Sequence, residues 1–404
     1  MKKNYIVTLL LVSIVLGCHK NRAREKINDN KDIINIPQIT YIKISDISKK
    51  ADFCYNTDNF YSYLSNINNN GTIVGTIAVK SDTGDSCKNQ SYYLTLNNIK
   101  TFMINSVDNP FDDDTLSIGT QVISNISSNN NSVGHTLILD ADTRTFHDLA
   151  NYNIGVNSTS ILDYNYMYHI SENGQYATFG NLGGQYGVID ITNSKVIDET
   201  MFDLNDMPMD AIQGMLVQVN NTGNIVGYIN NQNEIGVFCS FSNKHCKALE
   251  TDKSINSYLE TISENSAWAY GFTNGNNGST SVFYIKDINH NNNQLNPVMI
   301  KKLDNFIVLG IENTTDQGLV IVKSQEDLKE YLYLPSTDKI YSVPEIANNI
   351  KLDLNPQNTV LGNIHISPNG QYMLIETMST TFDNKIMATV VYFPKGIEDF
   401  LEHN

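Results

Sequence analysis

Arginine is almost absent from this sequence of 404 residues, and Arg144 is the only arginine after residue 31. Sites that clamp a substrate carboxylate with several guanidinium groups are therefore excluded, because that planar recognition depends on arginine. Trp268 is the only tryptophan, so cofactor sites built from repeated tryptophans are excluded as well. The HExxH, GxxxxGK[ST], GxSxG and Cys-x-x-Cys motifs are also missing, which removes support for common metalloprotease, nucleotide-binding, serine-hydrolase and thiol-redox sites.

Acidic residues outnumber basic ones, and the imbalance is uneven along the chain. The formal net charge is −16, yet residues 1–31 contain seven lysines and arginines against two acids, which leaves −21 for the remainder. A body this acidic repels nucleic-acid phosphates, so we expect no nucleic-acid partner. The charge suits solubility or a cationic partner.

One short pattern recurs along the chain and predicts its architecture. Val219–Gly227 (VNNTGNIVG) has an apolar residue, a polar run ending in glycine, a β-branched pair and a second glycine, and Ile67–Gly75 repeats it closely. Each copy is typical of two strands joined by a tight turn, because Asn, Asp and Gly tolerate a left-handed backbone. The turn positions of the seven copies are Gly71, Asn130, Gly174, Gly223, Ser266, Gly318 and Gly370.

The spacing of these turns predicts the fold class. Successive turn positions are 43 to 59 residues apart, and strand-rich repeats of that period are typical of β-propellers with one four-stranded blade per repeat. We therefore predict an all-β protein, a seven-bladed β-propeller of four-stranded antiparallel blades, with residues 38–404 as its single domain. A short helix is predicted at Ile397–His403.

The last repeat supplies only three strands, so the last blade is expected to be closed by the N-terminal strand. Ile39–Ser45 precedes the first repeat and alternates apolar residues at Ile39, Tyr41 and either Ile42 or Ile44. Pairing outside Met387–Phe393 would complete that blade and cover two exposed sheet edges.

The N-terminal residues predict export. An apolar run of twelve residues, Tyr5–Leu16, is shorter than the ~20 residues that a membrane-spanning helix needs. It leads into Val-Leu-Gly-Cys ending at Cys18, which resembles a bacterial lipobox. The resemblance implies a lipoprotein signal peptide over residues 1–17 and a mature chain that begins at a lipidated Cys18 carrying acyl chains such as palmitate. An ordinary secretory signal with a chance cysteine is the alternative.

Residues 18–37 are predicted to be a flexible tether, because they are polar and charged and have no apolar period. His19 follows the lipobox cysteine in place of Asp, which in Gram-negative lipoproteins favours export to the outer membrane. We therefore expect a bacterial cell-envelope protein, an outer-membrane lipoprotein on the periplasmic face or the cell surface. Its only contact with the membrane would be the lipid anchor.

Four cysteines follow Cys18, and an even number in an exported protein suggests disulfides with three alternative pairings. Cys239 and Cys246 flank a tight turn between two predicted strands, so they are expected to face each other across a hairpin. Cys54 and Cys87 would then form the second disulfide.

The repeats resemble two known families. Ile67–Gly75 and Val219–Gly227 resemble the HAF repeats of bacterial extracellular proteins, and His135–Leu139 with the downstream His147–Leu149 resembles that family's His-Ala-Phe strand and Asp-Leu pair. Ile366–Gly370 (ISPNG) is similar to the propeller repeats of the TolB type. Both resemblances imply a β-propeller, and neither implies a catalytic residue.

The densest acidic cluster is a candidate calcium site. Asp108–Asp114 offers the oxygen ligands Asp112, Asp113 and Asp114. A solvated acidic loop explains the same residues, and we favour that interpretation, so no cofactor is expected.

Two function classes follow from the sequence. The first is a non-catalytic binding or scaffolding propeller, anchored in the envelope, that docks a protein partner. The second is a carbohydrate-active propeller that binds, hydrolyses or cleaves a glycan with carboxylates and aromatic side chains at the central pocket. The scarcity of arginine and tryptophan and the absence of nucleophile motifs favour the first. Two or more acids that converge at one mouth of the channel would favour the second.

Overall fold

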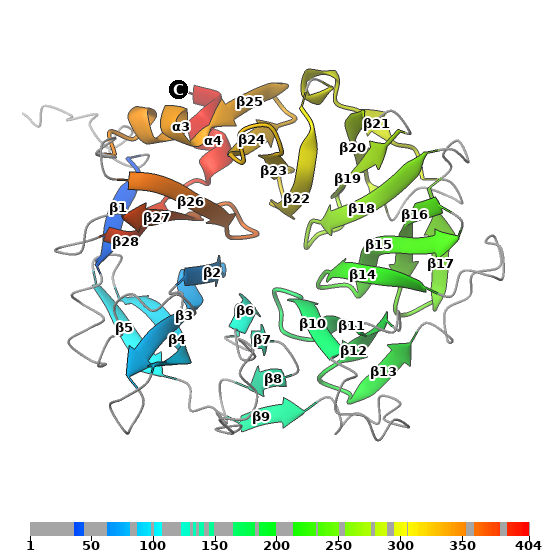
Figure 1. Ribbon diagram of the computed structural model, residues 1–404, viewed down its shortest axis with the longest axis horizontal. Coiled ribbons are helices and arrows are strands. Elements are labelled where there is room, and N and C mark those ends of the chain that lie inside the picture. The colour runs from blue at the N-terminus through cyan, green and yellow to red at the C-terminus, as the bar shows by residue number, and fades with distance from the viewer. Residues whose placement is uncertain are drawn as a thin grey trace, which may run out of the picture. The chain divides into compact units, whose positions relative to one another are not determined.

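The computed structural model describes residues 36–43, 63–80, 87–97, 101–106, 123–129, 132–134, 137–140, 145–148, 165–181, 186–198, 213–231, 233–249, 255–275, 279–288, 295–304, 306–352, 359–379 and 386–403. The signal peptide, residues 18–35 of the tether with Cys18, and Cys54, Arg144 and Asp112–Asp114 lie outside these ranges. Within them the backbone forms seven four-stranded antiparallel sheets (Figure 1).

Six sheets consist of four consecutive strands. They are β2 (Tyr63–Ile67), β3 (Thr72–Lys80), β4 (Cys87–Asn97) and β5 (Thr101–Ser106); β6 (Ile123–Ile126), β7 (Ser132–Gly134), β8 (Leu137–Asp140) and β9 (Thr145–Asp148); β10 (Asn165–Ile170), β11 (Tyr176–Asn181), β12 (Tyr186–Asp190) and β13 (Lys195–Asp198); β14 (Gln213–Val219), β15 (Asn224–Asn231), β16 (Asn233–Ser240) and β17 (His245–Ala248); β18 (Asn256–Ile262), β19 (Trp268–Asn274), β20 (Thr280–Lys286) and β21 (Val298–Met299); and β22 (Val308–Thr314), β23 (Val320–Ser324), β24 (Glu330–Leu334) and β25 (Lys339–Ser342).

The remaining sheet is composite. It contains β26 (Thr359–Ile366), β27 (Tyr372–Ser379) and β28 (Ile386–Tyr392), and its fourth strand is β1 (Gln38–Lys43). The uniform seven-bladed propeller expected from the sequence is therefore corrected to six blades of four consecutive strands and one composite sheet. Among the described residues, no strand of one sheet forms backbone hydrogen-bond pairs with a strand of another sheet. The seven sheets therefore do not join into one closed sheet. The last repeat stops after three strands because the chain then enters a helix.

β1 pairs antiparallel with β28, with Thr40 opposite Val390 and Ile42 opposite Ala388. Its apolar residues pack on two clusters, Ile39 against the one that contains α4 and Ile42 in the one that contains β2. Thr40 and Ile42 are buried, whereas Tyr41 is 36% exposed. Ile42 is buried because it packs in one apolar cluster with Leu64 and Ile67 of β2.

The core lies between neighbouring sheets. One cluster joins Val188 and Ile197 of the β10–β13 sheet to Leu216 and Val237 of the next sheet. Another joins Ile42 of β1 and its sheet to the β2–β5 sheet. Side chains alternate across a strand, so each sheet can contribute to the clusters on both of its faces. Burial of apolar area in these clusters is the main stabilising term.

Two short helices cover the composite sheet and its neighbour. The prediction of a helix at the C-terminus is confirmed by α4 (Ile397–His403), whose Phe400 and Leu401 join the apolar cluster there. A second helix, α3 (Val343–Asn349), was not predicted. Its capping box pairs the Ser342 side chain with the Glu345 backbone and the Glu345 side chain with the Ser342 backbone.

Every sheet has a bulge or irregularity in the ladder between its first and second strands. The second glycine of the sequence pattern lies opposite the residue before the irregularity, as Gly227 does opposite Leu216. A Cβ atom on Gly227 would lie 2.0 Å from the Met215 carbonyl oxygen. The repeated glycine is therefore needed where the bulged backbone approaches closely.

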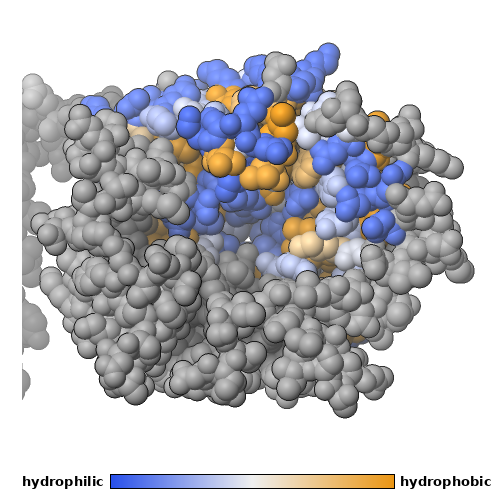
Figure 2. Space-filling view, in the orientation of Figure 1, coloured by the Kyte–Doolittle hydropathy of each residue, from blue (hydrophilic) through white to orange (hydrophobic). Residues whose placement is uncertain are grey.

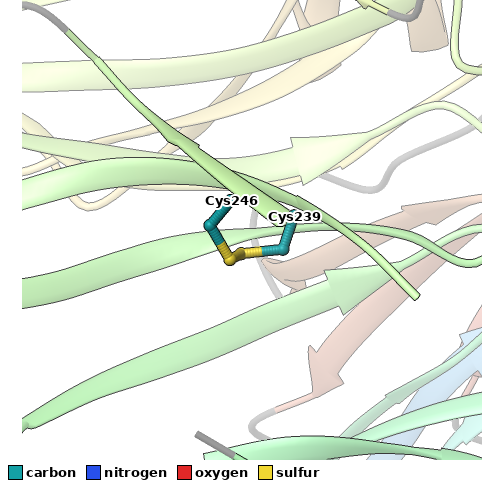
Figure 3. The surroundings of a disulfide bond; sticks show 2 residues. All are labelled: Cys239 and Cys246. Atoms are coloured by element: carbon teal, nitrogen blue, oxygen red, sulfur yellow. A yellow bond between two sulfur atoms is a disulfide. The ribbon is translucent and has the colours of Figure 1, made fainter. Parts of the chain in front are cut away.

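A disulfide joins Cys239 of β16 to Cys246 of β17 (Figure 3). The two residues are register partners in neighbouring strands, and both are buried. They are the two cysteines that the sequence analysis placed across a hairpin. Cys87 begins β4, and its proposed partner Cys54 lies outside the described residues.

We expect reduction of this disulfide to lower the free energy of unfolding by about 2.5 kcal/mol, the loop-closure value for so short a loop. Its loss frees the outermost strand β17 from β16, and replacement of the cysteines by alanine also removes both sulfur atoms from the apolar cluster that contains them. Chemical unfolding of wild type and of a Cys239→Ala, Cys246→Ala variant would measure the difference. Equal unfolding midpoints would show that the bond adds nothing to stability.

Candidate functional site

In each of the seven repeats, the first strand (β2, β6, β10, β14, β18, β22 or β26) lies nearest the centre in Figure 1, and a tight turn joins it to the next strand. The residue at the predicted turn position has a left-handed backbone in the six described copies. Their φ angles are 74° for Gly71, 71° for Gly174, 73° for Gly223, 60° for Ser266, 93° for Gly318 and 70° for Gly370. The turn positions are therefore confirmed for these copies, and Asn130 lies outside the described residues.

The first residue of each turn is a buried Asn, Ser or Thr whose side chain holds the turn. Asn220 Oδ1 accepts the backbone N–H groups of Thr222 (3.1 Å) and Asn224 (3.0 Å). Ser367 Oγ accepts the N–H of Tyr372 at 2.9 Å. This is ordinary Asx and Ser turn chemistry, which explains why the sequence pattern has polar residues at a buried position.

Neighbouring turns are joined by a repeated contact in which an asparagine donates both its backbone N–H and its side-chain amide to one residue of the next turn. The pairs are Asn173 with Asn221, Asn265 with Asp316, and Asn369 with Asn69. The last pair joins turns 300 residues apart, where Asn369 N–H is 2.7 Å from Asn69 Oδ1. The turns therefore form a hydrogen-bonded series that includes the first and last repeats.

Two buried glutamates extend from their own turns to others. Glu172 accepts the Asn69 N–H at 2.9 Å and the Ser128 hydroxyl. Glu264 accepts the N–H groups of Glu172 at 3.1 Å and Asn221 at 2.7 Å. Because these carboxylates satisfy buried backbone donors, their oxygens are structural acceptors rather than a free acid–base pair. The convergence of acids that would have favoured glycan chemistry is present, but these groups are occupied.

Burial raises the pKa of these carboxyl groups. The pKa of Glu172 is raised to about 7, against the opposing effect of its hydrogen bonds. Burial, followed by the nearby Glu172 charge, raises the pKa of Glu264 well above its usual range, and burial also raises the pKa of Asp316. An acid with a raised pKa in the folded state contributes stability at low pH, and this is lost as the pH rises towards that pKa.

We therefore expect Glu172→Gln to gain stability relative to wild type as the pH rises from about 4.5 to about 7. In this pH range Glu172 loses its proton in the unfolded wild-type chain but keeps it in the folded chain. The glutamine side chain of the variant does not titrate in either state, so its stability does not change with pH in this way. The expected gain is on the order of 2–3 kcal/mol. Parallel stability curves of the two proteins against pH would contradict this.

A second charged group lies where the β22–β25 sheet meets the composite sheet. Lys323 Nζ is 3.9 Å from Glu312 Oε1 and 3.8 Å from Glu330 Oε1, and it donates to Asn363 Oδ1 at 3.1 Å. His365 of β26 completes this group. We call Glu312, Lys323, Glu330, Asn363 and His365 the Lys323 cluster.

The electrostatics of the Lys323 cluster reflect its enclosure by protein. Burial and the Glu312 charge raise the pKa of Glu330 to about 8, and burial raises the pKa of Glu312. Burial and the Lys323 charge lower the pKa of His365 to about 4. Both His365 and Glu330 are therefore neutral at pH 7, so Lys323 is paired with no more than one ionised carboxylate, that of Glu312.

Part of the Lys323 cluster is open to solvent. The Glu312 side chain is 33% exposed and that of Lys323 24%, whereas that of Glu330 is 3% exposed. Glu312 belongs to β22, one of the strands nearest the centre in Figure 1. Figure 2 shows a hollow in the middle of the visible face, with hydrophilic residues on the coloured part of its wall.

The sequence analysis did not find the Lys323 cluster. Its residues are single charges within otherwise apolar strands, such as Lys323 in VIVKS and Glu330 in EYLYL. That interruption of the apolar pattern was the only available signal, because the contacts join different repeats. The calcium candidates Asp112, Asp113 and Asp114 lie outside the described residues. Within the described part of the chain, no group of three or more His, Cys, Asp or Glu residues is suited to hold a metal ion.

No protein-family model matches the sequence, and no curated protein matches it. No helix in the described ranges has both the length and the apolar character needed to cross a membrane. The resemblance to HAF repeats thus has no support beyond the residues that suggested it.

Solved structures similar to this chain include a β-propeller domain. The β-propeller domain of the trilobed protease from Pyrococcus furiosus is 9% identical, with 83% of this chain and 94% of that chain covered and a TM-score of 0.47. YCF48 from Cyanidioschyzon merolae is 11% identical, with 83% and 96% covered and a TM-score of 0.49. A putative TolB from Agrobacterium tumefaciens is 9% identical, with 58% and 79% covered and a TM-score of 0.39. All three TM-scores are below 0.5, and no property of these proteins is transferred to this chain.

Proposed function

We propose that this protein is an envelope-anchored lipoprotein whose β-propeller is a non-catalytic binding or scaffolding domain for a protein partner. The lipid on Cys18, the tether over residues 18–37 and the outer-membrane location are parts of this proposal that rest on the sequence. The intact mass of the mature protein tests the anchor, since an unmodified N-terminus or cleavage elsewhere would contradict it.

One observation carries the binding role. Ile307, Leu309 and Leu328 are 40%, 50% and 67% exposed. They belong to one end of the β22–β25 sheet, because the Gln325 N–H, near Leu328 in the chain, donates to the Ile307 carbonyl at 2.7 Å. Figure 2 shows hydrophobic residues on the visible face over this sheet, beside the central hollow. Exposed apolar side chains that lie together beside polar ones are typical of protein-interaction surfaces.

Capture from crosslinked bacterial envelopes tests this role. We expect the full-length protein to retain a protein partner, and we expect a Leu309→Ser, Leu328→Ser variant to lose most of it. Val298→Ser is the matched control, because Val298 is also 47% exposed but lies on β21 of another sheet. Equal capture by all three proteins, or turnover of a glycan by the wild type, would contradict the proposal.

A further inference from the structure

The turns between the first and second strands of the repeats contain acids and no bases. Their four-residue segments are 68–71, 127–130, 171–174, 220–223, 263–266, 315–318 and 367–370. The only charged residues in these segments are Glu172, Glu264 and Asp316, each at the second position of its turn. Buried acids are normally paired with a cation, so this one-sided composition needs an explanation.

Glu172 links the turns of three repeats. Its own turn belongs to the third repeat, and its Oε1 accepts the Asn69 N–H of the first repeat at 2.9 Å and the Ser128 hydroxyl of the second. The Ser128 N–H also donates to the Glu172 carbonyl at 2.6 Å. Glu172 is 6% exposed, so contact between these three turns depends on a carboxyl group that is shielded from water.

Glu264 links the turns of the third, fourth and fifth repeats in the same way. Its Oε1 accepts the Glu172 N–H at 3.1 Å, and its Oε2 accepts the Asn221 N–H at 2.7 Å. Asp316 of the sixth repeat accepts the Asn265 N–H of the fifth at 2.9 Å. The three acids therefore belong to one series of hydrogen bonds that includes the first six repeats.

The charged groups that face these acids have the same sign. Asp316 faces Glu172, both of them face Glu264, and Glu398 of α4 faces Asp316. The turns of the other repeats present only Asn, Ser, Thr, Pro and Gly. Within the described part of the chain none of the four acids forms an ion pair. Burial therefore favours the neutral acids, and it raises the pKa of Glu172 to about 7 and that of Glu264 well above its usual range.

We propose that these carboxyl groups make the turns a pH-sensitive joint, which holds the first repeats together in acid and loosens locally as Glu172 and then Glu264 ionise. A carboxylate among the closed turns meets only like charges, so separation of the turns and entry of water lower its free energy. For Glu172 the preference for closed turns is complete below about pH 4.5 and is lost as the pH rises to about 7. This joint is a property of the fold and does not depend on the proposed function.

Amide hydrogen exchange of the full-length protein, corrected for the intrinsic pH dependence of exchange, tests the joint. We expect protection of the segments that contain the Asn69 and Asn221 amides to fall at least about tenfold between pH 5 and pH 8, the equivalent of one pKa unit. The Lys244 amide is the internal reference, because it donates to the Ser240 carbonyl at 2.8 Å in a turn without acids. Its protection should not change.

Two variants separate this titration from the loss of any carboxyl group. Glu172→Gln keeps an oxygen that can accept the Asn69 N–H but cannot ionise, so it should remove most of the fall at Asn69. Glu326→Gln changes an exposed carboxyl in the turn between β23 and β24 and should behave as wild type.

Unchanged protection of Asn69 in the wild type, an equal loss at Lys244, or an equal loss at Asn69 in Glu172→Gln would overturn the inference. If Glu172→Gln does not fold, the comparison of Asn69 with Lys244 in the wild type decides alone.

Discussion

Removal of residues 19–43 is expected to lower the melting temperature sharply or cause aggregation, whereas removal of residues 19–36 should leave both unchanged. The longer deletion removes β1, which pairs with β28 along its whole length and places Ile42 in the cluster shared with the β2–β5 sheet. It also exposes the edge of β28, which becomes a template for pairing with other chains.

A pair of single substitutions gives the same comparison without a deletion. Ile42→Ala should cost about 3 kcal/mol, because a fully buried side chain leaves a cavity. Tyr41→Ala, one residue away on the other face, should cost well under half of that. Equal melting temperatures for the two truncations, or equal costs for the two substitutions, would show that β1 does not support the composite sheet.

Gly227→Ala is expected to have the second large effect. The new Cβ would lie 2.0 Å from the Met215 carbonyl oxygen and 2.9 Å from Leu216 Cα, both backbone atoms that cannot move aside cheaply. Overpacking of this kind costs roughly 3 kcal/mol or more. The reason is the bulge between Leu216 and Gln218, which brings the first strand close to the second.

Gly310→Ala is the matched control. Gly310 also lies in a sheet next to an irregular ladder, but a Cβ there would meet nothing within 4 Å. We therefore expect a change of less than about 1 kcal/mol. If both glycine variants unfold at the same denaturant concentration, the close approach of the backbone at the bulge is not the reason that this position requires glycine.

The sequence predicted the parts of the fold that depend on local chemistry. The left-handed turn positions, such as Gly223 and even Ser266, followed from residue types that tolerate or stabilise turns. The helix α4 was also predicted, with the bounds that the structure has. The helix α3 was missed although Ser342 and Glu345 have the spacing of a capping box, so that signal was present in the sequence and was not used.

Contacts between repeats could not be predicted from the sequence. Glu376 accepts the Leu64 N–H across 312 residues of chain, and Lys323 meets Asn363 from another sheet. Such pairs depend on how blades pack, which neither turn chemistry nor strand alternation specifies. The alternation in β1 left either Ile42 or Ile44 as its last apolar position, and the burial of Ile42 depends on packing against the β2–β5 sheet.

Crosslinking followed by peptide mapping tests the central claim most directly, since it locates the partner on the propeller. Lys329, beside Leu328, has a side chain that is 65% exposed, and Lys195 and Lys244 are exposed on two other sheets. With an amine-reactive crosslinker in intact envelopes, a protein partner docked on the β22–β25 sheet should be joined to Lys329 and not to Lys195 or Lys244. Crosslinks spread evenly over the three lysines, or confined to Lys195 and Lys244, would contradict the account.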